Sequence, residues 1–90
     1  MSIVDEILSL SHVAKNQIGR ITALGQRVAS NNESTMVKRL RDMGFEEGRL
    51  VEIMHTGPFG ADPMAVRVEG STIALRRAEA SLIQVQVEKA

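Results

Sequence analysis

From Gly48 to the end of the chain, apolar residues recur at every second position, in short runs that glycine and proline interrupt. A period of two is typical of β-strands with one buried and one solvated face. It is found over residues 50–55, 64–68, 72–76 and 83–87. Strands this short must share one apolar interior, and a small sheet buries its apolar face best by curling into a barrel.

The connections between these runs carry turn residues. Residues 56–63 are rich in Gly and Pro, which predicts an exposed loop. Gly70 and Ser71 separate the second run from the third, and Gly in the first central position of a two-residue connection predicts a type II′ hairpin. Residues 77–81 are expected to form a short helical connector.

The clearest helix precedes these strands, over about residues 31–43. Ser30 and Glu33 have the spacing of a capping box, which marks a helix start. One face of the segment is apolar and is expected to pack in the core; it carries Met36, Val37, Leu40 and Met43. Gly44 predicts the helix end, and Phe45 can fold back on the last turn as the hydrophobic contact of a Schellman cap.

The N-terminal part completes the expected fold. Residues 15–17 are typical of a turn, and residues 17–24 of a first strand in which Gly19 marks a close backbone approach or a bulge. Apolar residues at helical spacing predict a short helix over about residues 2–10, with a frayed terminal segment as the alternative. We therefore expect one mainly β domain over residues 1–90, with about five strands and one helix between the first and the second.

Composition excludes several classes of function. The 90 residues include 11 basic and 11 acidic side chains, and a net charge of zero argues against general nucleic-acid binding and against electrostatic docking to an anionic membrane. The absence of cysteine excludes disulfides, zinc ribbons and thiol chemistry, and is consistent with a reducing cytoplasm. No apolar run approaches the roughly 20 residues of a membrane helix. Asp5 and Glu6 stand where a secretory signal peptide would carry positively charged residues. Residues 1–10 are therefore expected to be part of the folded protein and not a signal peptide.

Residue patterns for catalysis or for metal binding are missing from the sequence. There is no nucleophile elbow and no phosphate-binding glycine loop, and the adjacent Glu46 and Glu47 are expected to face water. The two histidines, His12 and His55, form no short ligand pair, whereas a ferrous site usually gathers several His and carboxylate ligands. We expect neither an enzyme nor a bound cofactor or metal ion.

The order of these features resembles the FeoA family, the small cytoplasmic partner proteins of the bacterial ferrous-iron transporter FeoB. The resemblance covers about residues 8–87, so that residues 1–7 form an N-terminal extension or short helix. Its most specific parts are residues 40–48 and 64–76, and its matching positions include Met43-Gly44-Phe45, Gly48, Asp62-Pro63, Gly70 and Ile73-Ala74-Leu75-Arg76. Asn16 stands where the family usually has Gly, and Ala61 is interpreted as a one-residue insertion in the loop before Asp62.

The resemblance implies a fold and a function. The family fold is a Src-homology-3-like β-barrel with a helix between the first two strands. The implied function is that of a non-enzymatic, cytoplasmic accessory protein of ferrous-iron uptake that acts by protein–protein contact with the GTPase of FeoB. Transition-metal binding is implied by the family description alone. The alternative is regulatory, because a similar barrel forms the C-terminal domain of iron-dependent transcriptional repressors, and a free-standing copy could regulate by binding protein.

Candidate contact residues for a protein partner come from the exposed-loop argument and from charge. They are Pro58, Phe59, Asp62 and Met64 in the loop, with Arg41 and Arg77 as an electrostatic rim. Phe59 is one of only two aromatic residues, and the alternative is that it covers one end of the barrel as part of the core. For the arginines, the alternative is an ordinary solvated surface.

Overall fold

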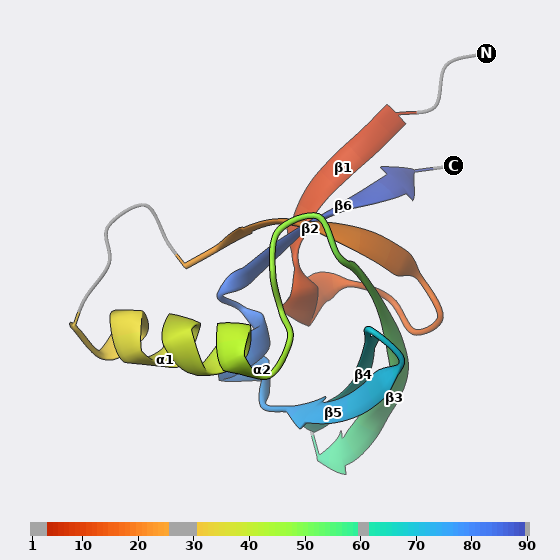
Figure 1. The fold of residues 1–90 in the computed structure, drawn as a ribbon. Helices are drawn as coiled ribbons and strands as arrows, with labels where there is room; N and C mark the ends of the chain where they lie inside the picture. Colours follow the sequence, from red (N-terminus) through yellow and green to blue (C-terminus); the bar gives the residue numbers. More distant parts are fainter. Residues whose placement is uncertain (1–3, 26–30, 60–61, 90) are drawn as a thin grey trace.

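The computed structural model describes residues 4–25, 31–59 and 62–89. Six antiparallel strands form one sheet in the order β1-β6-β2-β3-β4-β5 (Figure 1). The strands are β1 (Val4–Ser9), β2 (Ile18–Leu24), β3 (Leu50–Phe59), β4 (Asp62–Val68), β5 (Ser71–Leu75) and β6 (Ile83–Lys89). The helix α1 (Asn31–Asp42) connects β2 to β3, the short helix α2 (Arg77–Ala80) connects β5 to β6, and a 3-10 turn, η1 (Leu10–His12), follows β1.

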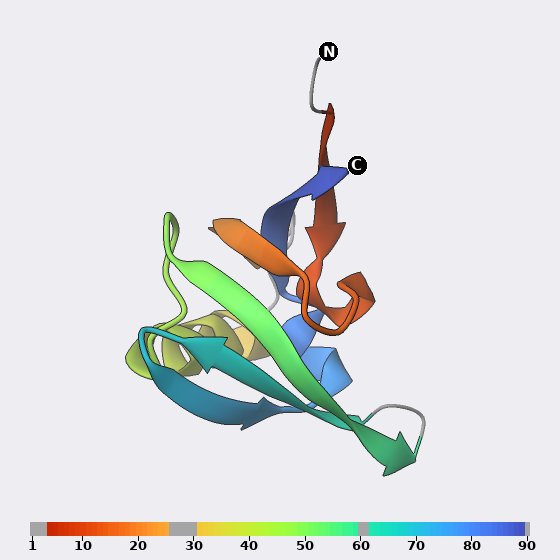
Figure 2. The same cartoon turned by 90° about the vertical axis from the view of Figure 1, so that its right-hand side faces the viewer.

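The predicted mainly β, Src-homology-3-like fold is confirmed, and the sheet is curled (Figure 2). Its inner face covers a single, mainly aliphatic core. Within the described residues β1 and β5 are its two edge strands and do not pair with each other, so the sheet is not closed. The strands after Gly48 alternate as predicted. The inward residues of the sheet are Ile21, Val51, Ile53, Met64, Val66, Val68, Leu75, Ile83, Val85 and Val87. Leu40 of α1 and Phe45 after it join the same cluster, which places the helix against the interior of the sheet.

The end of α1 has the geometry of a Schellman cap. The amide of Phe45 donates to the carbonyl of Leu40 at 3.0 Å, and the amide of Gly44 donates to the carbonyl of Arg41 at 3.0 Å. Gly44 has a φ of +112°, which an L side chain rarely adopts. Phe45 and Leu40 are both fully buried, so the predicted helix end and its hydrophobic contact are confirmed. The predicted capping residue Ser30 and the side chain of Glu33 lie outside the described residues.

The predicted N-terminal helix is wrong where the structure describes it. Val4–Ser9 is a strand that pairs antiparallel with β6, with Leu8 opposite Val85. This adds a sixth strand to the five expected. The helical pattern of this segment consists of only three apolar residues, which is too few to determine its conformation. Tertiary contacts with the far end of the chain determine it instead. Residues 1–3 lie outside the described part.

The predicted loop over residues 56–63 is mostly strand, which is a second correction. β3 continues to Phe59 and β4 begins at Asp62, so the two strands form one long hairpin. Gly57 allows this, because a Cβ there would lie 2.4 Å from the backbone oxygen of Asp62. The next turn also differs from the expectation. It is centred on Glu69 and Gly70 with φ values of 50° and 80°, the signs of a type I′ turn.

Two features of β2 agree with the sequence. The preceding turn contains Asn16 with a φ of 69°. At Gly19 a Cβ would lie 3.0 Å from Cγ1 of Val87 and 3.1 Å from Cβ of Val85, and the pairing of β2 with β6 shifts register between Ile21 and Ala23. The close approach expected at Gly19 is present, whereas the bulge lies further along the strand, between Ile21 and Ala23. In the part of the chain that the structure describes, no helix has the length and apolar character needed to cross a membrane.

Candidate functional site

Two of the predicted contact residues, Asp62 and Arg77, meet where the hairpin of β3 and β4 reaches α2. Oδ1 of Asp62 accepts a hydrogen bond from the backbone amide of Arg77 at 3.1 Å. The guanidinium of Arg77 donates to the backbone carbonyl of Ser11 in η1. These bonds connect β4, α2 and η1. Both side chains therefore anchor the fold, and they lie at the edge of the surface that was predicted to contact a protein partner.

Other residues of the predicted contact set are distributed differently. Met64 is 1% exposed and belongs to the core, so its predicted place in an exposed loop is wrong. The inward parity of β4, which also buries Val66, is the reason. The backbone of Pro58 and Phe59 lies in β3, with Phe59 opposite Asp62. The side chains of Pro58 and Phe59 lie outside the described residues.

Arg41 lies near the end of α1 and is paired with a carboxylate of the same molecule. Its Nη1 and Nη2 donate to the two carboxylate oxygens of Glu47 at 2.7 and 3.0 Å. The hydrogen bonds from Arg41 lower the pKa of Glu47 from 4.5 to about 2, and the same contact raises the pKa of Arg41. Both side chains are 40% or more exposed, so water screens the pair and limits its contribution to stability.

A groove opens between α1 and the opposite elements β4, β5 and α2. It has a volume of about 800 Å³. Its lining residues are Met36 and Arg39 from α1, Met43 directly after α1, Asp62 and Pro63 from β4, Ala74 and Arg76 before α2, and Ala78 and Glu79 within α2. We call it the methionine groove. Met36 and Met43 were predicted as core residues, and each is half-buried: one side packs on the core and the other faces the groove.

The charges in the methionine groove are unequally engaged. Oε1 of Glu79 accepts from the backbone amide of Arg76 at 2.9 Å, and Asp62 accepts from the amide of Arg77. Neither Arg39 nor Arg76 forms an ion pair with any described residue. Both acidic groups have a backbone partner and keep their negative charge, so the two acidic and the two basic side chains of the lining balance formally.

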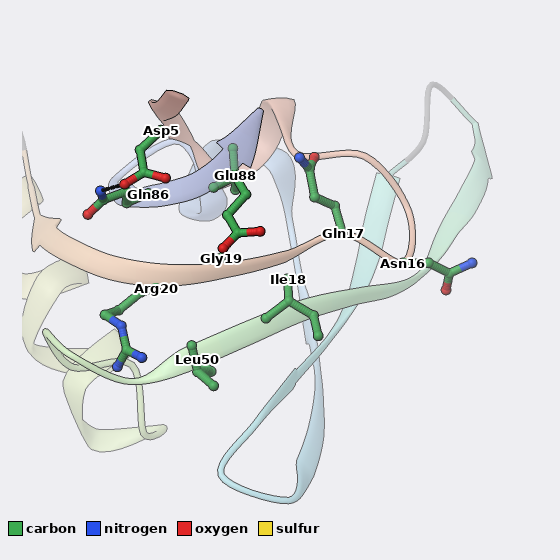
Figure 3. Close-up of a pocket in the computed structure, with 10 residues that line it drawn as sticks. Asp5, Asn16, Gln17, Ile18, Gly19, Arg20, Leu50, Gln86 and Glu88 are labelled. Atoms are coloured by element: carbon green, nitrogen blue, oxygen red, sulfur yellow. Dashed lines mark hydrogen bonds between the residues drawn. The ribbon is translucent and has the colours of Figure 1, made fainter. Parts of the chain in front are cut away.

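A second hollow, of about 610 Å³, lies on the outer face of the sheet, over β1, β6, β2 and β3 (Figure 3). Ile18 and Leu50 line it and are 55% and 52% exposed. Nε2 of Gln86 donates to Oδ2 of Asp5 at 2.6 Å at its side (Figure 3). The alternation of residues 50–55 placed Leu50 outward, but it did not settle the direction of Ile18 and could not show that the two residues lie on neighbouring strands.

The described residues do not fit a metal centre. No three His, Cys, Asp or Glu side chains among them converge as ligands. His12 and His55 are exposed and lie on different elements, η1 and β3. Iron is therefore not assigned a site on this part of the chain.

Comparisons with known proteins agree with this fold. The structure is similar to FeoA from Stenotrophomonas maltophilia, a prokaryotic Src-homology-3 domain protein solved with zinc and suggested to activate ferrous-iron transport. The identity is 28% and the TM-score 0.73, over 92% of this chain and 99% of that one. An FeoA-like protein from Clostridium acetobutylicum is 27% identical with a TM-score of 0.77, over 91% of this chain and 87% of that one.

A manganese-dependent transcriptional repressor shares the fold. It is 16% identical with a TM-score of 0.75, and the match covers 96% of this chain but 44% of the repressor. No curated protein matches the chain by sequence. The family model that describes the FeoA domain matches residues 8–87, which is nearly the whole chain. The chain therefore belongs to the FeoA family.

Proposed function

We propose that this protein is a non-enzymatic, cytoplasmic accessory factor of ferrous-iron uptake that binds the transporter FeoB on its cytoplasmic GTPase portion. The observation that carries the proposal is the FeoA family match over residues 8–87. The fold shared with two FeoA structures of 27% and 28% identity supports it.

In this proposal the protein acts by binding one state of its partner better than another. A bound protein shifts a conformational equilibrium only by the difference in its affinity for the two states. Docking on the GTPase would therefore change nucleotide turnover or transport gating only where one nucleotide state is preferred. The protein itself needs no reactive group for this role.

The proposed contact surface includes the end of the long hairpin, with Pro58, Phe59 and Asp62, and the neighbouring Arg77. Asp62 and Arg77 support the hairpin end through their mutual hydrogen bond. Arg41 would take part by exchanging Glu47 for a carboxylate of the partner. Met64 would act only from inside, by holding β4 against the core.

The experiment is a pull-down of the tagged protein from membranes of its own host, with GTP analogue, with GDP and without nucleotide. Recovery of FeoB, with a dependence on nucleotide, is expected. Recovery of a transcription factor in place of FeoB would refute the transporter contact and favour the repressor-related alternative.

A matched pair of variants locates the contact. Pro58→Ser with Phe59→Ser changes the hairpin end, and Ile18→Ser with Leu50→Ser changes two exposed apolar residues on the outer face of the sheet. We expect the first pair to lose FeoB and the second to retain it. Circular dichroism confirms that both variants are folded. Equal recovery by the two folded variants would contradict the hairpin assignment.

A further inference from the structure

β5 is one of the two edge strands of the sheet, and it lies at the lower margin of the sheet in Figure 2. Among the described strands it pairs only with β4. Natural edge strands are often protected from further pairing by charged residues or by proline. The other edge strand, β1, contains Asp5 and Glu6, whereas β5 has neither a charged residue nor a proline. The edge of β5 is therefore open to another strand.

The register of the β4–β5 hairpin indicates which backbone groups of β5 face this open edge. Its two-residue turn closes on the pair Val68 and Ser71, and such turns are closed by a hydrogen bond between these two residues. Hydrogen-bonded and non-hydrogen-bonded pairs alternate along an antiparallel ladder, so every second residue of β5, counted from Ser71, bonds to β4. The N–H and C=O groups of Thr72 and Ala74 then point away from β4, and both residues are exposed.

The two backbone amides that follow β5 continue this alternation. The amide of Arg77 donates to Oδ1 of Asp62, on the side of the paired strand β4. The amide of Arg76 donates instead to Oε1 of Glu79 in α2. The open edge therefore ends before Arg76 and contains one N–H and one C=O group from each of the two outward residues. Within the described ranges, no hydrogen bond from another element reaches these groups.

We propose that two copies of this chain pair antiparallel through β5, about a two-fold axis at Ile73. In this register Thr72 of each copy lies opposite Ala74 of the other, and the two residues of such a pair exchange both N–H···O bonds. Every open backbone group of both edges is then satisfied. An axis at Thr72 would place Gly70 of the turn opposite Ala74. An axis at Ala74 would place the amide of Arg76, which already has a partner, opposite Thr72.

The side chains of β5 favour the same register. Ile73 is half-buried and packs against the core from the inner face of the sheet. At the two-fold axis it meets Ile73 of the second copy in a non-hydrogen-bonded pair, the kind in which opposite side chains lie closest. This contact removes apolar surface from water. On the outer face, the opposing Thr72 and Ala74 are small and do not hold the two backbones apart.

Opposite charges meet at both ends of the paired segment. The register places the Glu69-Gly70 turn of one copy beside Arg76 of the other. Arg76 is exposed and has no ion-pair partner in the part of the chain that the structure describes. The side chain of Glu69 is 59% exposed, and its contact with Arg49 is 3.5 Å long. Because a strand of another protein would satisfy the backbone without these matched charges, a second copy of this chain is the occupant that fits.

The first test measures the mass of the full chain in solution by sedimentation equilibrium. Two short paired strands form a small interface, so the dimer is expected to dissociate on dilution. The average mass should rise from 9.8 kDa towards twice that value as the concentration increases from about 10 μM to about 1 mM. A mass of 9.8 kDa at every concentration would overturn the inference. The experiment contains no other protein, so its result is independent of FeoB binding.

A pair of charge variants tests the register. Arg76→Glu and Glu69→Arg each place like charges at both ends of the interface, so each variant alone should dimerise about tenfold more weakly than the wild type. Mixed in equal amounts, the two variants should form a heterodimer, because each end then joins an acidic to a basic residue. Circular dichroism confirms that each variant is folded. A mixture that associates no better than either variant alone would refute the register.

Arg67→Glu is the matched control, because it changes the net charge by the same amount as Arg76→Glu. Arg67 is exposed and has no ion pair among the described residues, but it lies on β4, one strand inside the edge. We expect this variant to dimerise like the wild type. If it weakens the dimer as much as Arg76→Glu, net charge and not the proposed contact is responsible, and the register is wrong.

Two further measurements test the backbone contact itself. Ala74→Pro removes one outward N–H group and no bond to β4, which an edge strand tolerates, so the variant should fold and remain monomeric. In the wild type, hydrogen exchange of the Thr72 and Ala74 amides should slow as the protein concentration increases. A folded Ala74→Pro variant that dimerises like the wild type would overturn the inference. So would a mass that doubles while exchange at both amides stays constant, because the dimer would then use another surface.

Discussion

Replacing Gly44 by alanine tests the account of how α1 ends. Gly44 has a φ of +112°, and its carbonyl accepts a hydrogen bond from Nη1 of Arg49 at 2.8 Å. A Cβ at this position would be no closer than 3.6 Å to Arg49 and 3.9 Å to Val68. There is room for the methyl group, so the cost of Gly44→Ala should come from the backbone conformation alone.

The size of that cost follows from two opposing effects. Holding an L residue at positive φ costs about 1–2 kcal/mol. Alanine also restricts the unfolded chain more than glycine does, which returns about 0.4–1 kcal/mol. The net destabilisation expected for Gly44→Ala is about 1 kcal/mol, or a fall in melting temperature of about 4–8 °C for a domain of this size.

The assay is urea unfolding at pH 7, in which the midpoint should fall and the m-value should stay constant. A chemically synthesised chain with D-alanine at position 44 is the control, because positive φ is the preferred region of a D residue. That protein should be more stable than the wild type by about 0.4–1 kcal/mol. If L- and D-alanine have the same effect, backbone strain is not the reason for glycine at this position.

Three further changes test the core, the ion pair and the hairpin anchor. Met64→Ala should cost about 2–5 kcal/mol in urea unfolding, and a surface-like cost below about 0.5 kcal/mol would contradict its burial. Glu47→Gln should remove less than about 1 kcal/mol of stability above pH 4.5, because Arg41 holds the pKa of the exposed Glu47 near 2. The difference in free energy of unfolding between Glu47→Gln and the wild type should disappear as the pH falls from 4.5 towards 2. Thermal melts in which this difference stays constant over that pH range would refute the assigned role of the ion pair. Asp62→Ala should speed hydrogen exchange of the Arg77 amide by about tenfold, and unchanged exchange would show that the 3.1 Å bond is not protective.

Local patterns predicted the regular part of the fold correctly. The alternation after Gly48 placed the inward residues of β3, β4, β5 and β6, and the Gly44-Phe45 pair placed the end of α1. In these segments the residue pattern, the turn residues and the tertiary packing all favour one structure. Such agreement between levels is what makes a segment predictable from its sequence.

The incorrect predictions arose where a distant partner decides the local structure. Val4–Ser9 is a strand because β6 offers an edge to pair with, which no local pattern records. Gly57 and Pro58 indicated a loop, yet at Gly57 the missing side chain lets the two strands of the hairpin approach closely. At Glu69 the turn places a non-glycine residue at positive φ, which shifted the turn by one residue from its expected position.

The candidate site was only partly predictable. Sequence reasoning identified Asp62, which lines the methionine groove, but it assigned Met36 and Met43 wholly to the core. Their half-exposure arises where α1 and the turn after it lie beside β5 and α2, and these elements follow α1 in sequence only after two and three strands, respectively. The hydrogen bonds from backbone amides to Asp62 and Glu79 also depend on the tertiary structure and have no signal in the sequence.

The position of β1 at one edge of the sheet has a consequence for the order of folding. β3, β4 and β5 follow one another along the chain and pair through short connections, whereas β1 pairs only with β6 at the opposite end of the sequence. Closing a long loop costs entropy before any contact repays it, so local pairs form early and distant ones late. The meander from β3 to β5 should therefore form first and β1 should join last. Local unfolding of β1 would then expose an edge of β6 while the elements around the methionine groove stay assembled.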